Sequence, residues 1–143
     1  MQLLGLQWAG VNSRFTQDGL RQIQFAQNPD GGWSQTPNLA SDAYATGQVL
    51  YTLHELGVAA SSPAYQRGVE YLVRTQQYDG SWHVRSRAPK IQPYFESGFP
   101  YGPDQWISSM ATSWAAIGLT YATPPPETAA RAQSSATETK AEF

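Results

Sequence analysis

The stretch RGVEYLVRTQQYDGSW, residues 67–82, has a weaker copy 49 residues earlier in the chain, GLRQIQFAQNPDGGW at residues 19–33. Both copies contain a Gln, then an Asp-Gly pair, and both end on Trp. A fixed spacing of about 50 residues is typical of folds built from repeated helical hairpins. The residues that match at this spacing are Gly19 and Gly68, Gln27 and Gln76, Asp30 and Asp79, Gly31 and Gly80, and Trp33 and Trp82.

Each copy is predicted to form a helix, a turn and a second helix. Ser62-Pro63 is a typical helix start, with Ser at the N-cap and Pro at the first helical position. Apolar residues then recur at helical spacing until the turn at Asp79-Gly80. Ser41 or Asp42 is expected to cap the helix that follows the first copy, and Gly57 to end it near residue 56.

Further helices are expected over residues 105–122 and, as a shorter element, over residues 3–9. No segment shows the sustained alternation of a β-strand, so the chain is predicted to be all-α. The stripe expected to face the core from the last helix comprises Ile107, Met110, Ala111, Trp114, Ile117, Gly118 and Tyr121.

The predicted organisation is one repeat module at residues 1–122, followed by a tail. The repeats cover about residues 16–57 and 62–122. The second carries 17 extra residues, which form a loop insertion over about residues 83–104 that is rich in Pro and aromatic side chains. The tail, 123–143, begins with three prolines and has few large apolar residues, so disorder is expected there.

Composition narrows the possible partners. The 143 residues carry a net charge of -2 without a basic cluster, which argues against a nucleic-acid surface. There is no Cys and only two His, so neither a metal site nor any cofactor is predicted. No apolar stretch reaches the ~20 residues of a transmembrane helix.

Residues 67–82 closely resemble the QW motif of squalene-hopene and oxidosqualene cyclases, and residues 20–33 resemble a second copy. The resemblance implies an α/α toroid, of which this chain would form a partial barrel of two to three repeats from the C-terminal part. It implies that the motif residues tie neighbouring helices together rather than act in catalysis. These structural residues are Gln27, Gly31, Trp33, Gln76, Gly80 and Trp82.

The resemblance also points to the place where a catalytic acid would lie. Bacterial members of the family carry an Asp-x-Asp-Asp-Thr-like motif, and Asp42-Ala43-Tyr44-Ala45-Thr46 stands in that position. Asp42 and Thr46 match, but Tyr44 replaces the proton-donating Asp, and a phenol is far too weak an acid to protonate an alkene. Asp42 remains the one catalytic candidate, with helix capping as the alternative.

A ligand-binding surface is expected to be aromatic. Such side chains stabilise cations and pack against apolar ligands, although the insertion also needs apolar residues to form a core of its own. A second group, with His83, Arg85, Arg87 and Glu96, would either bind a polar or anionic ligand or pair internally. The ligand-binding candidates are Tyr44, Tyr94, Phe95, Glu96, Phe99, Tyr101 and Trp106.

The sequence is compatible with three functions. The first is a squalene-cyclase-like module that is not catalytic on its own and binds an apolar, isoprenoid-like small molecule. The second is a C-terminal fragment of an active terpene cyclase whose acid lies elsewhere. The third is a non-catalytic scaffold or sugar-binding α/α module. Because two to three repeats do not close a toroid, the chain is expected either to form a homo-oligomer or to lack the rest of a longer protein.

Overall fold

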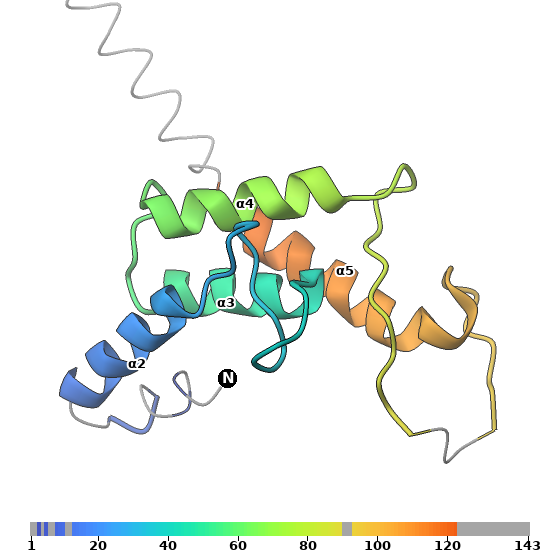
Figure 1. Ribbon diagram of the computed structural model, residues 1–143, viewed down its shortest axis with the longest axis horizontal. Coiled ribbons are helices and arrows are strands. Elements are labelled where there is room, and N and C mark those ends of the chain that lie inside the picture. The colour runs from blue at the N-terminus through green and yellow to red at the C-terminus, as the bar shows by residue number, and fades with distance from the viewer. Residues whose placement is uncertain (1–2, 4, 6–7, 11–12, 90–92, 123–143) are drawn as a thin grey trace, which may run out of the picture.

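The computed structural model describes residues 3, 5, 8–10, 13–89 and 93–122, and within them the regular structure is helical with no strand (Figure 1). The helices are α2 (Ser13–Phe25), α3 (Ala43–Glu55), α4 (Pro63–Thr75) and α5 (Gln105–Thr120). A short 3-10 helix, η1 (Gly102–Asp104), leads directly into α5. The all-α prediction is confirmed. The predicted helix at residues 3–9 and the predicted disordered tail lie partly or wholly outside the described residues.

Two hairpins, α2–α3 and α4–α5, make the fold. Helices α3 and α5 make the most extensive helix–helix contact, and α4 lies along this pair (Figure 1). Leu50 and Leu53 of α3, Tyr65 and Leu72 of α4, and Ala115 of α5 are fully buried between them. The core therefore lies where the two hairpins meet.

The contact between α3 and α5 is made by small residues. A Cβ atom added at Gly47 would lie 2.4 Å from the carbonyl carbon of Trp114 and 2.6 Å from the amide nitrogen of Ala115. The buried face of α5 consists of Gln105, Ser108, Ala111, Ala115 and Gly118.

The sequence-based prediction for the face of α5 was therefore only partly correct. Ala111 and Gly118 do face the core, but Met110, Ile117 and Tyr121 are 49%, 38% and 37% exposed. The reason is the close approach of α3, which leaves room only for small side chains. The larger residues of the predicted stripe lie at the edge of the contact or outside it.

The two turns that end the sequence copies have the same internal structure. In each, the Trp indole donates to a carbonyl ten residues earlier, Trp33 Nε1 to Ile23 at 2.8 Å and Trp82 Nε1 to Leu72 at 2.9 Å. Both Trp side chains are 3% exposed.

Each turn is also fastened to the helix that follows it. The Trp33 amide donates to Thr46 Oγ1 and the Trp82 amide to Thr112 Oγ1, both at 3.0 Å. The 49-residue spacing thus corresponds to equivalent positions in space, with Thr46 and Thr112 equivalent in spite of the insertion.

Glycine is required in both turns for the same reason. Gly31 and Gly80 have φ values of +89° and +84°, a conformation that costs other residues roughly 1–2 kcal/mol. In each turn an Asp side chain then accepts the next amide, Asp30 Oδ1 from Gly32 and Asp79 Oδ1 from Ser81, both at 3.0 Å.

Helix boundaries agree with most of the sequence signals. Pro63 begins α4, and Gly57, with φ +75°, follows the end of α3. Ser62 is an exception, because its side chain makes no capping bond and its Oγ is buried without a hydrogen-bond partner in the described structure. In the described part of the chain, no helix is long and apolar enough to cross a bilayer.

Candidate functional site

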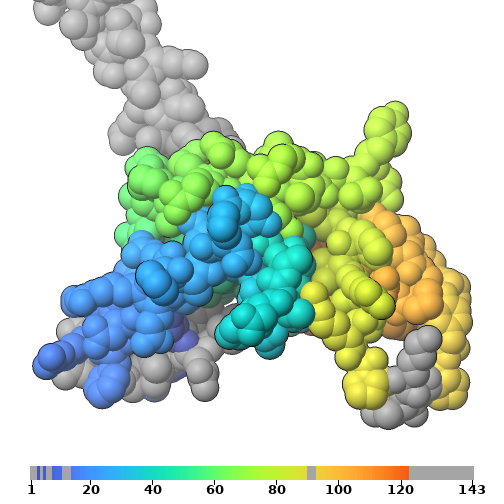
Figure 2. Space-filling model, viewed as in Figure 1, coloured from blue at the N-terminus to red at the C-terminus, as the bar shows by residue number. Residues whose placement is uncertain are grey.

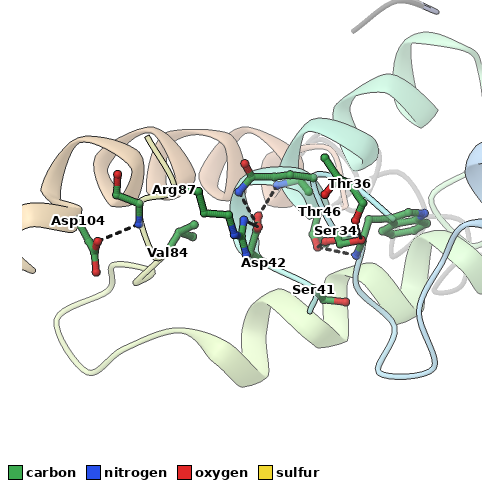
Figure 3. Close-up of polar contacts among 12 residues, drawn as sticks. Ser34, Thr36, Ser41, Asp42, Thr46, Val84, Arg87 and Asp104 are labelled. Atoms are coloured by element: carbon green, nitrogen blue, oxygen red, sulfur yellow. Dashed lines mark hydrogen bonds and ion pairs between the residues drawn. The ribbon is translucent and has the colours of Figure 1, made fainter. Parts of the chain in front are cut away.

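Asp42 lies at the N-terminus of α3 and is almost completely buried, with 8% of its surface exposed. Its Oδ1 accepts the Ala45 amide at 2.8 Å, which is the geometry of an N-cap. Its Oδ2 accepts Gln35 Nε2 at 2.7 Å, and Arg87 Nη1 lies 3.6 Å from the same oxygen. Figure 3 shows the side chains of Asp42 and Arg87 directed at each other.

These contacts decide what the carboxyl group can do. Both oxygens of this carboxyl group already accept hydrogen bonds from the protein, and the Arg87 guanidinium lies beside one of them. A group held in this way is poorly suited to donate a proton to an alkene. The surroundings of Asp42 therefore fit the capping role better than the catalytic one.

The equivalent position in the second repeat is Ser108. Its hydroxyl accepts the Val84 amide at 3.0 Å and donates to the Val84 carbonyl at 3.2 Å. The first residues of the insertion thus cross the N-terminus of α5, and Arg87, slightly further along, reaches the N-terminus of α3 (Figure 3). One loop covers both helix starts.

A contact between His83 and Asp104 joins the two ends of the insertion. His83 Nε2 lies 2.8 Å from Asp104 Oδ2, and Asp104 Oδ1 accepts the Ser86 amide at 2.8 Å. The His83 ring stacks on Tyr101 with 4.6 Å between ring centroids. Tyr101 itself has a φ of +85°, which is uncommon for a residue other than Gly.

Asp104 therefore does not act as the simple N-cap that its position before the last helix indicates. It makes no side-chain capping bond to α5, since η1 precedes that helix. The hydrogen bond from His83, and then the one from the Ser86 amide, lower the pKa of Asp104 below its usual value.

We expect the Asp104→Asn variant to show that the contact between His83 and Asp104 stabilises the fold in a pH-dependent way. Because the pKa of Asp104 is lower in the folded chain, the stability it contributes is present at neutral pH and is lost as the pH falls through its folded value, below about 4. The melting temperature of Asp104→Asn should be lower than that of the wild type at pH 7, and the difference should shrink as the pH falls below the ordinary pKa of an Asp side chain, about 4. Thermal unfolding of both proteins from pH 7 down to acidic pH measures this difference in melting temperature. A difference that stays constant with pH would contradict the prediction.

Gln105 is a structural residue that the sequence did not reveal. It is fully buried, its Nε2 donates to the Phe95 carbonyl at 2.9 Å, and its Oε1 accepts the Ser97 amide at 2.5 Å. The far end of the insertion is thereby fixed to the start of α5. A buried Gln at a helix start has no sequence signature, because exposed Gln is common there.

The aromatic residues predicted to bind a ligand do not form a single cluster in the structure. Phe95 and Trp106 stack with 6.3 Å between centroids and are 69% and 55% exposed. Tyr94, 60% exposed, hydrogen-bonds Glu96, and this bond is the first cause of the raised pKa of Tyr94. Phe99 lies beside Tyr101, which adjoins the His83 pair.

Tyr44 is placed differently from the loop aromatics, since it is partly buried and packs against the main core from α3. The structure thus brings Phe95 and Trp106 together on the surface without Tyr44 between them. We refer to the stacked and exposed pair Phe95 and Trp106 as the aromatic surface. Among the described residues, no group of three or more His, Cys, Asp or Glu side chains is arranged to hold a metal ion.

Comparisons with known proteins agree with the repeat structure. The chain matches the model of the squalene-hopene cyclase C-terminal domain over residues 2–135. It is 28% identical over 107 residues to a probable squalene–hopene cyclase of Sinorhizobium fredii, which covers 75% of this chain and 16% of that protein. It is 34% identical over 85 residues to a drimenyl diphosphate synthase of Streptantibioticus cattleyicolor, covering 59% of this chain and 15% of that protein.

The chain thus spans about one sixth of the length of these two relatives. No solved structure matches it. The family match covers both hairpins, the insertion and the start of the tail, far more than half of the chain. With its paired turns and its all-helical hairpins, this chain belongs to the squalene-hopene cyclase C-terminal domain family.

Proposed function

We propose that this chain is a repeat module that binds an apolar, isoprenoid-like molecule and does not itself supply a catalytic acid. The observation that carries the second half of this proposal is the environment of Asp42. Its two oxygens are engaged by Ala45, Gln35 and Arg87. Tyr44 stands at the position where the sequence resemblance implies an acid.

The aromatic surface supports the first half of the proposal. Phe95 of the insertion and Trp106 of α5 stack on each other and are 69% and 55% exposed. Exposed apolar groups that lie together mark binding surfaces more often than isolated ones do. Aromatic side chains offer an apolar face to a hydrocarbon and a negative face to a cation. The two cyclase relatives make an isoprenoid the ligand class to test first.

The proposal is tested by measuring whether the purified chain binds an isoprenoid ligand. We expect squalene or a C15 isoprenoid alcohol, presented in detergent, to bind the purified chain. Trp106→Phe should weaken that binding about fivefold, the effect of ~1 kcal/mol. Trp8→Phe is the matched control, because Trp8 is similarly exposed, at 68%, but lies outside the aromatic surface. Equal effects of both variants would mean non-specific adsorption and would contradict the proposal.

Product analysis separates this proposal from its alternative. The short span relative to the two relatives favours a fragment of an active cyclase as the second candidate. In that case the acid lies in another part of a longer chain. Conversion of squalene or the C15 alcohol by this chain alone, detected by gas chromatography and mass spectrometry, would overturn the non-catalytic reading.

A further inference from the structure

The aromatic surface has a charged side chain, that of Glu96, fixed close to it. Gln105, the first residue of α5, donates from Nε2 to the Phe95 carbonyl at 2.9 Å and accepts the Ser97 amide at 2.5 Å. Glu96 lies between these two anchored residues, and Trp106 follows Gln105 directly. Figure 2 shows the end of the insertion, in yellow-orange, lying against the orange start of α5 on the surface. The carboxyl group therefore belongs to a segment that is held against the start of the helix carrying Trp106.

Hydrogen bonds within the insertion orient this carboxyl group. The Tyr94 hydroxyl donates to Glu96 Oε2, and Glu96 Oε1 accepts the Gly98 amide at 3.0 Å. These bonds, the one from Tyr94 first, lower the pKa of Glu96, so the group is ionised at neutral pH. Each carboxylate oxygen can accept more than one hydrogen bond. Glu96 is exposed, and it can therefore accept a further donor from a bound molecule.

The sequence around the aromatic surface supplies no basic side chain that would neutralise Glu96. Residues 93–122 contain two acidic residues, Glu96 and Asp104, and no Lys, Arg or His. Asp104 is in contact with His83, whereas the hydrogen bonds to Glu96 described above come from neutral donors. Asp104 also precedes α5 directly, where a negative charge offsets the partial positive charge of the helix end. A negative potential is therefore expected around the aromatic surface.

We propose that Glu96 selects the head group of the molecule bound at the aromatic surface, and that it favours an isoprenoid amine over an alcohol or a diphosphate. The inference rests on the proposed function, because Phe95 and Trp106 have to bind the apolar chain first. The hydrocarbon would lie on these two stacked rings, whose centroids are 6.3 Å apart. The protonated amine would then pair with the carboxylate of Glu96.

The three head groups differ in what they can exchange with this carboxylate. An ammonium group donates up to three hydrogen bonds and carries the opposite charge, and aromatic faces attract it as well. A hydroxyl group can donate one hydrogen bond but carries no charge. A diphosphate is negatively charged, so bringing it near Glu96 places like charges together. The expected order of affinity is therefore amine, then alcohol, then diphosphate.

Binding of three C15 isoprenoids that differ only in their head group tests the inference on the intact 143-residue chain. In neutral detergent, at low salt and pH 7, the amine should bind about threefold more tightly than the alcohol, an effect typical of an exposed ion pair. The diphosphate should bind more weakly than the alcohol, again by about threefold. Raising the salt concentration to ~0.5 M should reduce both differences, because salt screens exposed charges.

The Glu96→Gln variant separates the charge of the side chain from its shape. The Gln oxygen can still accept the Gly98 amide, so the loop should be kept. The amine and the alcohol should then bind within about twofold of each other, since the ion pair is lost. Glu70→Gln is the matched control, because Glu70 is an exposed acidic residue on α4 and its replacement changes the net charge equally. This control should leave the preference for the amine unchanged.

The remaining outcomes overturn the inference in distinguishable ways. If none of the three isoprenoids binds, the proposed function fails and the inference fails with it. If all three bind equally, the proposed function stands and the role of Glu96 alone is rejected. A preference that survives Glu96→Gln, or that Glu70→Gln also removes, would assign the selection to other charges of the chain.

Discussion

Gly47→Ala should lower the melting temperature by about 12 °C or more, the shift that corresponds to ~3 kcal/mol in a domain of this size. The added methyl group would lie 2.4–2.6 Å from backbone atoms of Trp114 and Ala115. Backbone cannot rotate away as a side chain can, so α3 and α5 would have to separate and the core would loosen with them. The helix propensity gained by replacing Gly with Ala, up to ~1 kcal/mol, is smaller than this cost.

Two other helical glycines provide graded controls for this prediction. A Cβ added at Gly68 would meet side-chain atoms of Trp33 and Leu50 at 2.8 and 2.9 Å, and one at Gly118 would meet Leu50 Cβ at 3.1 Å. Thermal unfolding followed by circular dichroism should therefore rank the losses as Gly47→Ala, then Gly68→Ala, then Gly118→Ala. An unchanged or raised melting temperature for Gly47→Ala would mean that α3 and α5 do not approach this closely.

The helical hairpins could be predicted from the sequence because their signals are local. Pro63 at a helix start, Gly57 after a helix end, and the Gly31 and Gly80 turns each fix the backbone within a few residues. The 49-residue repeat then makes the two turns equivalent, and their hydrogen bonds are equivalent in the structure.

The face of α5 could not be predicted in the same way. Hydrophobic periodicity favours large residues such as Met110 and Ile117 for the core, but helix–helix distance decides which sizes fit. Gly47, 63 positions before Met110, brings α3 close enough that only residues such as Ala111 and Ala115 are accommodated. That information is not contained in either helix alone.

The candidate site could likewise be predicted from the sequence only in part. The position of Asp42 at a helix start follows from the residues around it. Its partner Arg87 lies 45 positions later, at a point in the insertion where the neighbouring described residues form no helix, and nothing in the sequence pairs the two. The pairing of His83 with Asp104, and the burial of Gln105, likewise depend on how the two ends of that insertion meet.

Replacing the tryptophan of either turn is the second change expected to lower stability strongly. Trp33→Ala and Trp82→Ala should each cost ~3–5 kcal/mol of unfolding free energy, because each indole is 3% exposed and its removal leaves a cavity. A loss of this size is comparable with the whole stability of a small domain, ~5–15 kcal/mol, so both variants should be largely unfolded at moderate urea concentrations.

Trp→Phe variants separate packing from hydrogen bonding in this prediction. Phe keeps most of the buried ring but removes the Nε1 bond to Ile23 or Leu72, so we expect a smaller loss of ~1–3 kcal/mol from the unpaired carbonyl. Urea unfolding followed by far-ultraviolet circular dichroism, rather than by Trp fluorescence, measures all four variants on one scale. Losses below ~1 kcal/mol for the Ala variants would contradict the burial of the indoles. Equal losses for Phe and Ala would instead assign the stabilisation to the Nε1 bond, and the turns would then be held by polar contacts more than by packing.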